Sequence, residues 1–224
     1  MKKIDILGVL VDHTDMNGAL ARCEAFLQEE GSHVVYTPNS EIIMMAYHDP
    51  GFCKTVNSAD LIVPDGIGVV YASRILKAPL PERVAGFDLS SNLIEKAAEK
   101  AYSLYFFGGK PGVAEKAIDA LRQKYPNLNV VGYSDGYFDA EKEKQIIEDI
   151  QTKKPDILFV CLGAPKQEKW IAAHREQIGA RLILGVGGSL DVWAGVAERA
   201  PEAYQKAGLE WLYRLKKEPS RFFR

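Results

Sequence analysis

The chain has 224 residues with 28 basic and 30 acidic side chains, and its net charge of -2 gives no overall attraction to nucleic acid or anionic lipid. Its hydrophobic content of 47 % is typical of a soluble globular protein with one large domain. No apolar run has the length of a membrane span, and no signal peptide is recognisable at the N-terminus. Cys23, Cys53 and Cys161 are scattered, which favours reduced thiols over disulfides or a metal site.

The first half of the chain alternates short apolar runs with helical patterns. Strands are predicted at residues 4–11, 34–37 and 61–63. Thr14 is expected to cap a helix that continues to Glu30, before Gly31. Further helices are predicted at 40–46, 52–57, 69–76 and 88–100, with a break at Asp49-Pro50-Gly51.

From residue 103 the alternation becomes regular. Strands are predicted at 103–107, 129–133, 156–162 and 181–186, and helices at 113–125, 140–152 and 166–177. Such βαβ units form right-handed crossovers between parallel strands. The sequence therefore predicts an α/β fold over residues 1–195, with a Rossmann-like, mainly parallel sheet flanked by helices.

Residues 196–224 differ in character and are expected to form a short C-terminal helical appendage. Leu209, Leu212 and Leu215 recur at helical spacing, whereas Pro219 would interrupt a longer helix. The apolar face would suit a lipid surface equally well as packing on the protein's own domain or on a neighbouring subunit. The abrupt end after Arg224 leaves a truncated appendage open.

The segment Val63-Pro64-Asp65-Gly66 ends an apolar strand with a carboxylate and a tight turn. In open α/β sheets, ligands bind outside the carboxyl ends of the strands. Asp65 is therefore a candidate general base. The alternative is that Asp65 caps the following helix or forms an Asx-turn with Gly66.

Glycine-rich or polar turns follow several other predicted strands, at Thr37-Pro38-Asn39, Gly108-Gly109, Gly163-Ala164-Pro165 and Gly187-Gly188. Glycines allow a ligand to approach the backbone, and helix N-termini favour phosphate, which predicts a nucleotide or nucleotide-sugar site. The full dinucleotide fingerprint and the P-loop motif are missing, but an NAD-dependent oxidoreductase with a degenerate loop at Gly108 stays open.

Neither a D-x-D motif nor clustered histidines occur in the sequence, so we expect a reaction without a metal or other cofactor. Cationic side chains would then have to neutralise a leaving diphosphate. Arg83 and the arginines of the C-terminal segment are the candidates, although any one of them is as easily a solvated surface charge.

Taken together, these motifs resemble the WecG/TagA/CpsF family of glycosyltransferases, in its branch for wall teichoic acid synthesis. The resemblance runs from about residue 34 to the end of the chain. It rests on Thr37-Pro38-Asn39, Pro64-Asp65-Gly66, Arg83-Val84-Ala85-Gly86, Phe107-Gly108-Gly109, Leu162-Gly163-Ala164-Pro165-Lys166-Gln167-Glu168, Gly185-Val186-Gly187-Gly188, Arg199-Ala200-Pro201 and Gly208-Leu209-Glu210-Trp211-Leu212-Tyr213-Arg214.

The resemblance implies an inverting transfer of N-acetylmannosamine from a UDP donor to the 4-hydroxyl of N-acetylglucosamine on undecaprenyl diphosphate. Its implied catalytic residues are Asp65, Thr37, Asn39, Arg83 and Gln167. The UDP-sugar is expected at Gly108, Gly109, Tyr137, Gly163, Gly187, Gly188 and Asp191. Arg214, Arg221 and Arg224 are expected to clamp the diphosphate of the lipid, at the inner face of the cell membrane.

Physical reasoning alone does not determine the donor sugar, and a homo-oligomer remains open. A third hypothesis is a non-catalytic nucleotide-binding module or membrane adaptor. The expected partners are a UDP-sugar and a polyprenyl-diphosphate acceptor, with no role for nucleic acid.

Overall fold

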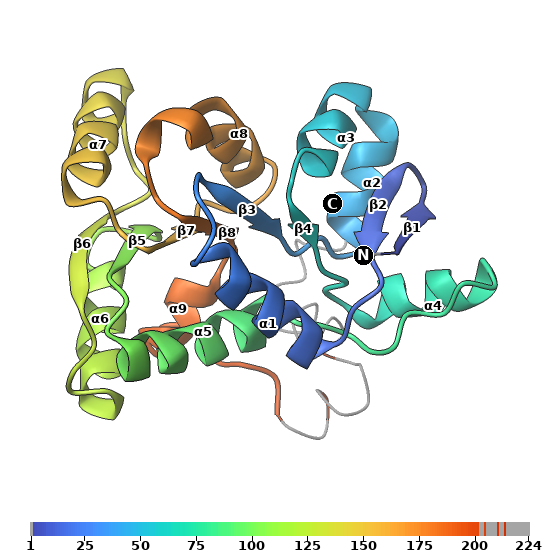
Figure 1. Cartoon of the computed structure of the whole chain (residues 1–224), viewed down its shortest axis with the longest axis horizontal. Helices are drawn as coiled ribbons and strands as arrows, with labels where there is room; N and C mark the ends of the chain where they lie inside the picture. The colour runs from blue at the N-terminus through green and yellow to red at the C-terminus, as the bar shows by residue number, and fades with distance from the viewer. Residues whose placement is uncertain (1, 202–203, 205–209, 211–212, 214–224) are drawn as a thin grey trace.

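A six-stranded parallel sheet lies at the centre of the molecule, with strand order β4-β3-β8-β7-β5-β6 (Figure 1). The computed structural model describes residues 2–201 together with Tyr204, Glu210 and Tyr213. The strands of this sheet are β3 (His33–Tyr36), β4 (Leu61–Ile62), β5 (Leu104–Gly108), β6 (Val130–Ser134), β7 (Ile157–Cys161) and β8 (Leu182–Gly185). The predicted Rossmann-like α/β fold is confirmed.

Helices cover both faces of the sheet. They are α1 (Met16–Phe26), α2 (Ser40–His48), α3 (Pro50–Asn57), α4 (Ile67–Ile75), α5 (Gly86–Lys100), α6 (Val113–Lys124), α7 (Ala140–Lys153), α8 (Lys166–Ile178) and α9 (Ser189–Trp193). The buried residues form two clusters, one on each face. One cluster contains residues of α2, α3, α4, α7 and α8. The other contains residues of α1, α5, α6 and α9.

The sheet separates the two clusters because consecutive strand residues point to opposite faces. In β5, Tyr105 and Phe107 belong to the first cluster, whereas Leu104 and Phe106 belong to the second. The central strands are buried on both sides, as expected for a parallel sheet between helices. This rigid core fixes the positions of the strand ends.

The single strand predicted at residues 4–11 was wrong, because the chain turns back within it. β1 (Lys3–Ile6) and β2 (Val9–Asp12) form an antiparallel hairpin outside the main sheet. Leu7 and Gly8 both have positive φ, as a two-residue turn requires, and Gly8 donates its N–H to the Asp5 carboxylate. Apolar residues therefore continue through a turn that pattern alone does not reveal.

The hairpin reaches the main sheet through Asp12. Its carboxylate accepts a hydrogen bond of 2.8 Å from the backbone N–H of Ile62, in the edge strand β4. Asp12 is almost fully buried, and burial raises its pKa despite the neighbouring Ile62 N–H and Lys3. The N-terminal hairpin is thus attached to the edge of the sheet by a buried polar contact.

Two helix starts also differ from the sequence prediction. Asp15, not Thr14, caps α1 by accepting from the Gly18 N–H, and α1 ends at Phe26 rather than near Glu30. Asp49 ends α2 and caps α3, which begins at Pro50. The predicted break at the end of α2 is therefore confirmed, but α3 begins at Pro50 rather than Phe52, because proline is favourable at a first helical position.

The sheet order creates a crevice at the carboxyl ends of β5 and β7. From β5 the chain passes through α6 to β6 on one side, and from β7 it passes through α8 to β8 on the other. Loops that leave adjacent strands in opposite directions leave space between them, which is where ligands bind in such folds.

Most of the predicted appendage lies outside the described residues, as do Arg214, Arg221 and Arg224. The proposed boundary near residue 195 and the diphosphate clamp therefore stay predictions. None of the helices in the described part of the chain combines the length and apolarity that crossing a membrane requires.

Substitution of the glycine at the end of β5 tests how closely β5 and β7 approach each other there. Gly108 has a φ of 133°, and an added Cβ would overlap the backbone carbonyl of Cys161 in β7. We expect Gly108→Ala to lower the free energy of unfolding by more than about 3 kcal/mol. Gly179→Ala, at a φ of 69° with open space around it, should cost only about 1 kcal/mol. Urea unfolding of both variants measures this, and equal losses would contradict the steric explanation.

Candidate functional site

The ends of β3, β4 and β8 bring three predicted residues into one region. Asp65 donates its backbone N–H to the Pro38 carbonyl, 3.2 Å away, which ties the turn after β4 to the turn after β3. The Thr37 hydroxyl donates to the Gly185 carbonyl at the end of β8, at 3.2 Å. Parallel strand ends therefore place Thr37, Asn39 and Asp65 side by side.

The Asp65 carboxylate contacts the start of a distant helix. Its Oδ2 accepts a hydrogen bond of 3.1 Å from the Gly86 N–H, the first residue of α5. The helix that directly follows Asp65, α4, begins after Gly66 without a side-chain cap. Asp65 thus does not cap α4. It lies instead at the N-terminus of α5, where its Oδ2 accepts the first N–H of that helix.

The side chain of Asn39 has a structural function in this region. Its Oδ1 accepts the Ile42 N–H at 3.0 Å and caps α2. Gly66 lies directly against it, since a Cβ there would be 3.5 Å from the Cβ of Asn39. The Asn39 amide nitrogen has no hydrogen bond among the described residues that would compete with a ligand.

Arg83 lies in an ionic cluster with residues far away in the sequence. It pairs with Glu210, and its Nη2 is 3.9 Å from the Asp88 carboxylate. Arg199 forms a bidentate salt bridge with the Asp88 carboxylate, in which both hydrogen bonds are 2.6 Å long. The Nε of Arg199 is 3.4 Å from the Glu210 carboxylate. We define Arg83, Asp88, Arg199 and Glu210 as the ionic cluster. It connects the residues after α9 to the loop that carries Arg83.

Gln167 is held firmly from both ends of its amide. Its Nε2 donates to the Glu168 carboxylate at 2.8 Å, and its Oε1 accepts the Gly187 N–H at 2.9 Å. Gln167 and Glu168 are only 3 % and 2 % exposed. The amide therefore fixes the loop after β8 to the first turn of α8.

Glu168 is a functional candidate that the sequence reading treated as a helix-dipole residue. Burial raises its pKa, and the hydrogen bond from Gln167 lowers it by less. Its Oε2 has no hydrogen-bond partner among the residues that the structure describes. Its backbone carbonyl accepts the Tyr36 hydroxyl at 3.0 Å. Such a buried carboxyl is costly, and it is retained here beside a predicted catalytic amide.

A cavity of about 530 Å³ opens in the crevice between the ends of β5 and β7. This volume is typical of small-molecule sites. Three of the residues predicted to bind the UDP-sugar line it, namely Gly109, Tyr137 and Asp191. Its other lining residues are Lys110, Gly136, Phe138, Cys161, Leu162 and Lys166.

The remaining glycines predicted for the UDP-sugar do not line the cavity. Gly108 is required by the close approach of β5 and β7. Gly187 donates to Gln167, and Gly188 precedes α9 in the same loop. Gly163 has a positive φ at the turn after β7. These residues shape the loops around the cavity, and their predicted contact with a ligand stays a prediction.

Two lysines of the cavity were not identified from the sequence. Lys110 is exposed at the turn after β5. Lys166 donates to the Gly136 carbonyl at 3.1 Å, and its Nζ lies 4.0 Å from the centre of the Phe138 ring. Both immediately follow a glycine turn at a strand end, which is the one signal that could have separated them from other surface lysines.

Other parts of the described chain offer less. A hollow of about 310 Å³ between α7 and α8 contains none of the predicted residues. Within the described ranges, no three His, Cys, Asp or Glu side chains gather as metal ligands. The cavity lysines could bind an anion, but their presence does not show how a reaction proceeds. A metal-independent reaction therefore stays a prediction.

The sequence is similar to those of known proteins from one family of glycosyl transferases. The profile of the Glycosyl transferase WecG/TagA/CpsF family matches residues 4–224. A relative from Staphylococcus aureus (strain MRSA252) is 38 % identical over 214 residues, which cover 95 % of this chain and 84 % of the relative. One from Bacillus spizizenii is 38 % identical over 197 residues, which cover 88 % and 76 %. Both are named N-acetylglucosaminyldiphosphoundecaprenol N-acetyl-beta-D-mannosaminyltransferase, and these names favour a transferase over the oxidoreductase alternative.

The buried Glu168 predicts a specific pH dependence of stability. Because its pKa is raised in the folded state, the folded protein keeps a proton that the unfolded chain loses near pH 4.5. The stability of the wild type relative to Glu168→Gln should therefore fall as the pH rises above 4.5. Urea unfolding of both proteins across this range measures the difference. Glu176→Gln, at an exposed site on the same helix, should parallel the wild type. Parallel curves for Glu168→Gln would contradict the burial effect.

Proposed function

The chain belongs to the WecG/TagA/CpsF family of glycosyl transferases, and we propose that it transfers N-acetylmannosamine from UDP to a lipid-linked N-acetylglucosamine. The names of both relatives suggest N-acetylglucosamine on undecaprenyl diphosphate as the acceptor, and we propose its 4-hydroxyl as the group that receives the sugar. The observation that carries the proposal is the position of a lysine-lined cavity and a carboxylate at the same end of one parallel sheet.

Asp65 serves as the general base in the proposed reaction. It takes the proton of the acceptor 4-hydroxyl while that oxygen forms a bond to C1 of the donor sugar. The bond from C1 to the UDP oxygen breaks, and UDP leaves with its electron pair, so the configuration at C1 inverts. The hydrogen bond from the Gly86 N–H at the start of α5 orients the carboxylate before the reaction.

Lys110 and Lys166 supply charge for the departing diphosphate. Both line the cavity together with Tyr137 and Asp191, which we propose to contact the nucleoside. A tyrosine ring offers a stacking surface for a base, and a carboxylate accepts hydrogen bonds from base or ribose. Positive charge directed at the leaving group stabilises the transition state more than the ground state.

Thr37, Asn39, Arg83 and Gln167 complete the proposed site. Gln167 positions the loop of Asp191 through Gly187, and Asn39 holds the turn beside Asp65. Arg83 exchanges Glu210 for an anionic group of the substrate. Arg214, Arg221 and Arg224 add charge for the lipid diphosphate, and this part of the proposal concerns residues outside the described structure. The acceptor places the protein at the inner surface of the cell membrane.

Replacing the proposed base gives the most direct test. Asp65→Asn keeps an oxygen that can accept the Gly86 N–H, but it cannot take a proton. We expect turnover to fall by about 100-fold or more, with UDP affinity nearly unchanged. Transfer from UDP-N-acetylmannosamine to a lipid-diphosphate acceptor measures turnover, and calorimetry measures UDP binding.

The control for this variant is Asp119→Asn, which changes an exposed carboxylate on α6. It should transfer at the wild-type rate. Wild-type turnover in Asp65→Asn would remove Asp65 from the mechanism. A loss of UDP binding in that variant would instead indicate damage to the fold.

The cavity lysines predict a separate effect on the donor. Lys110→Gln and Lys166→Gln should each weaken UDP binding about tenfold, since each removes one charge near the diphosphate. Lys116→Gln, on the exposed face of α6, is the matched control and should bind UDP normally. Unchanged UDP affinity in both cavity variants would place the donor elsewhere.

A further inference from the structure

The segment between Asp65 and Arg83 leaves the site and returns to it. Its outgoing part is α4, which extends away from the sheet to the edge of the molecule (Figure 1). The two ends of the segment are joined by the hydrogen bond from the Val84 N–H to the Pro64 carbonyl, at 2.9 Å. The bond between Gly86 and Asp65 strengthens this closure. The position of α4 is therefore coupled to the position of Asp65 and the residues around it.

The far end of α4 presents large apolar side chains to solvent. Ile75 is 81 % exposed, Leu76 is 53 % exposed and Tyr71 is 51 % exposed. Arg74 lies over the Tyr71 ring, 5.7 Å from its centre, and Lys77 directly follows Leu76 in the sequence. We define these residues, Tyr71, Arg74, Ile75, Leu76 and Lys77, as the α4 tip.

The α4 tip is an ordered structure. The Ser73 hydroxyl accepts the Leu80 N–H at 2.9 Å, and the Ser73 carbonyl accepts the Ala78 N–H at 3.0 Å. Both Ser73 and Leu80 are buried. The chain thus holds a turn that keeps Ile75 and Leu76 in water, which costs free energy unless another apolar phase covers them.

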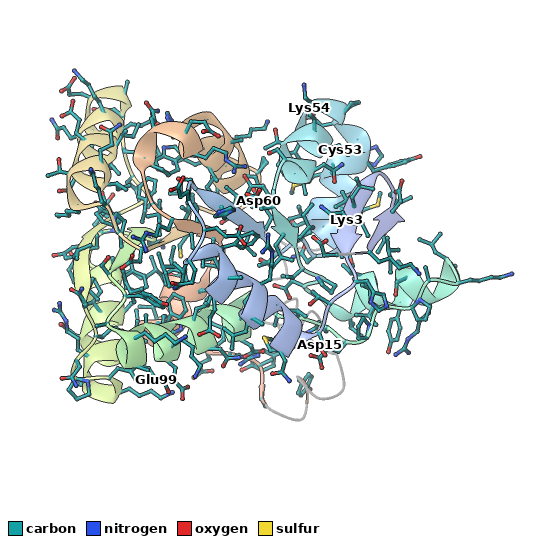
Figure 2. The ribbon with its side chains drawn as sticks, viewed as in Figure 1. Lys3, Asp15, Cys53, Lys54, Asp60 and Glu99 are labelled. Carbon is teal, nitrogen blue, oxygen red and sulfur yellow. The ribbon has the colours of Figure 1, made fainter. Side chains whose placement is uncertain are left out.

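The composition of the segment indicates what that phase is. Residues 66–81 contain Arg74 and Lys77 and no acidic side chain. An aromatic ring, aliphatic side chains and basic groups together are typical of a surface that enters the interface of an anionic membrane. Lys3 lies on the β1–β2 hairpin, which contacts α4, but its charge is balanced by Asp12 at 3.7 Å, so Arg74 and Lys77 carry the basic character of this side (Figure 2).

The length of α4 fits a substrate that stands on a membrane. Its nine residues span about 14 Å, at 1.5 Å per residue, and Asp65 lies just before its first turn. With the tip at the headgroup level, the length of α4 limits Asp65 to about 14 Å above that surface.

We propose that the α4 tip is a membrane-docking site that inserts Ile75 and Leu76 into an anionic lipid surface and sets the height of Asp65 above it. This inference rests on the proposed lipid-linked acceptor. It concerns a surface separate from the arginines of the C-terminal segment.

The test uses the full chain and vesicles of phosphatidylcholine with or without phosphatidylglycerol, and no UDP-sugar. Ile75→Ser/Leu76→Ser should bind the anionic vesicles about tenfold more weakly than the wild type. Arg74→Gln/Lys77→Gln should lose about tenfold on anionic vesicles and little on neutral ones. Tyr133→Ser, at an exposed site on the edge strand β6, should bind like the wild type.

Transfer assays separate this inference from the proposed function. Ile75→Ser/Leu76→Ser should use a short-chain, water-soluble acceptor at the wild-type rate, but it should be slower with acceptor embedded in vesicles. Wild-type vesicle binding by this variant would overturn the proposal. So would conversion of a dimer to a monomer without a change in vesicle binding, since the tip would then cover a second copy of the chain. Absence of transfer by the wild type would refute the proposed function while vesicle binding still reports on the tip.

Discussion

The side-chain amide of Gln167 is the interaction on which the rest of the site depends. Glu168 fixes its nitrogen, so its oxygen must face the Gly187 N–H. This bond joins the start of α8 to the loop after β8, and the same loop leads to Asp191 in the cavity. Lys166, one residue before Gln167, faces that cavity from the other side. The loop that leads to Asp191 and the first turn of α8 are therefore held together by one buried hydrogen-bond pair, which tolerates little change.

A second constraint is the closure of the segment from Pro64 to Gly86. Two hydrogen bonds return the chain to its starting point after an excursion of one helix and a turn. The structural role of Asp65 is compatible with the proposed one, because accepting an N–H at one oxygen fixes the orientation of the carboxylate. The ionic cluster adds the residues after α9 to the same region, so that Arg83 is charge-balanced before any substrate arrives.

Much of this arrangement could be predicted from the sequence, and the failures have physical causes. The strand ends at Thr37, Asp65 and Gln167 are visible because apolar runs end in polar or glycine turns. The Leu7-Gly8 turn was missed because leucine rarely adopts a positive φ. The bond between Asp65 and Gly86 depends on strand order, which local patterns do not encode. Lys110 and Lys166 were missed because the glycine turn before each is a weak signal, and the cavity that they line depends on the strand order.

The Asp12 carboxylate has a consequence for how the protein behaves at high concentration. β4 is an edge strand, and an open edge offers its backbone as a template for strands of other molecules. Asp12 already accepts the N–H of Ile62, and the hairpin covers this side of the strand. A neighbouring molecule would meet a buried carboxyl group where it needs a free backbone donor. The short hairpin at the N-terminus thus protects the sheet against intermolecular strand addition.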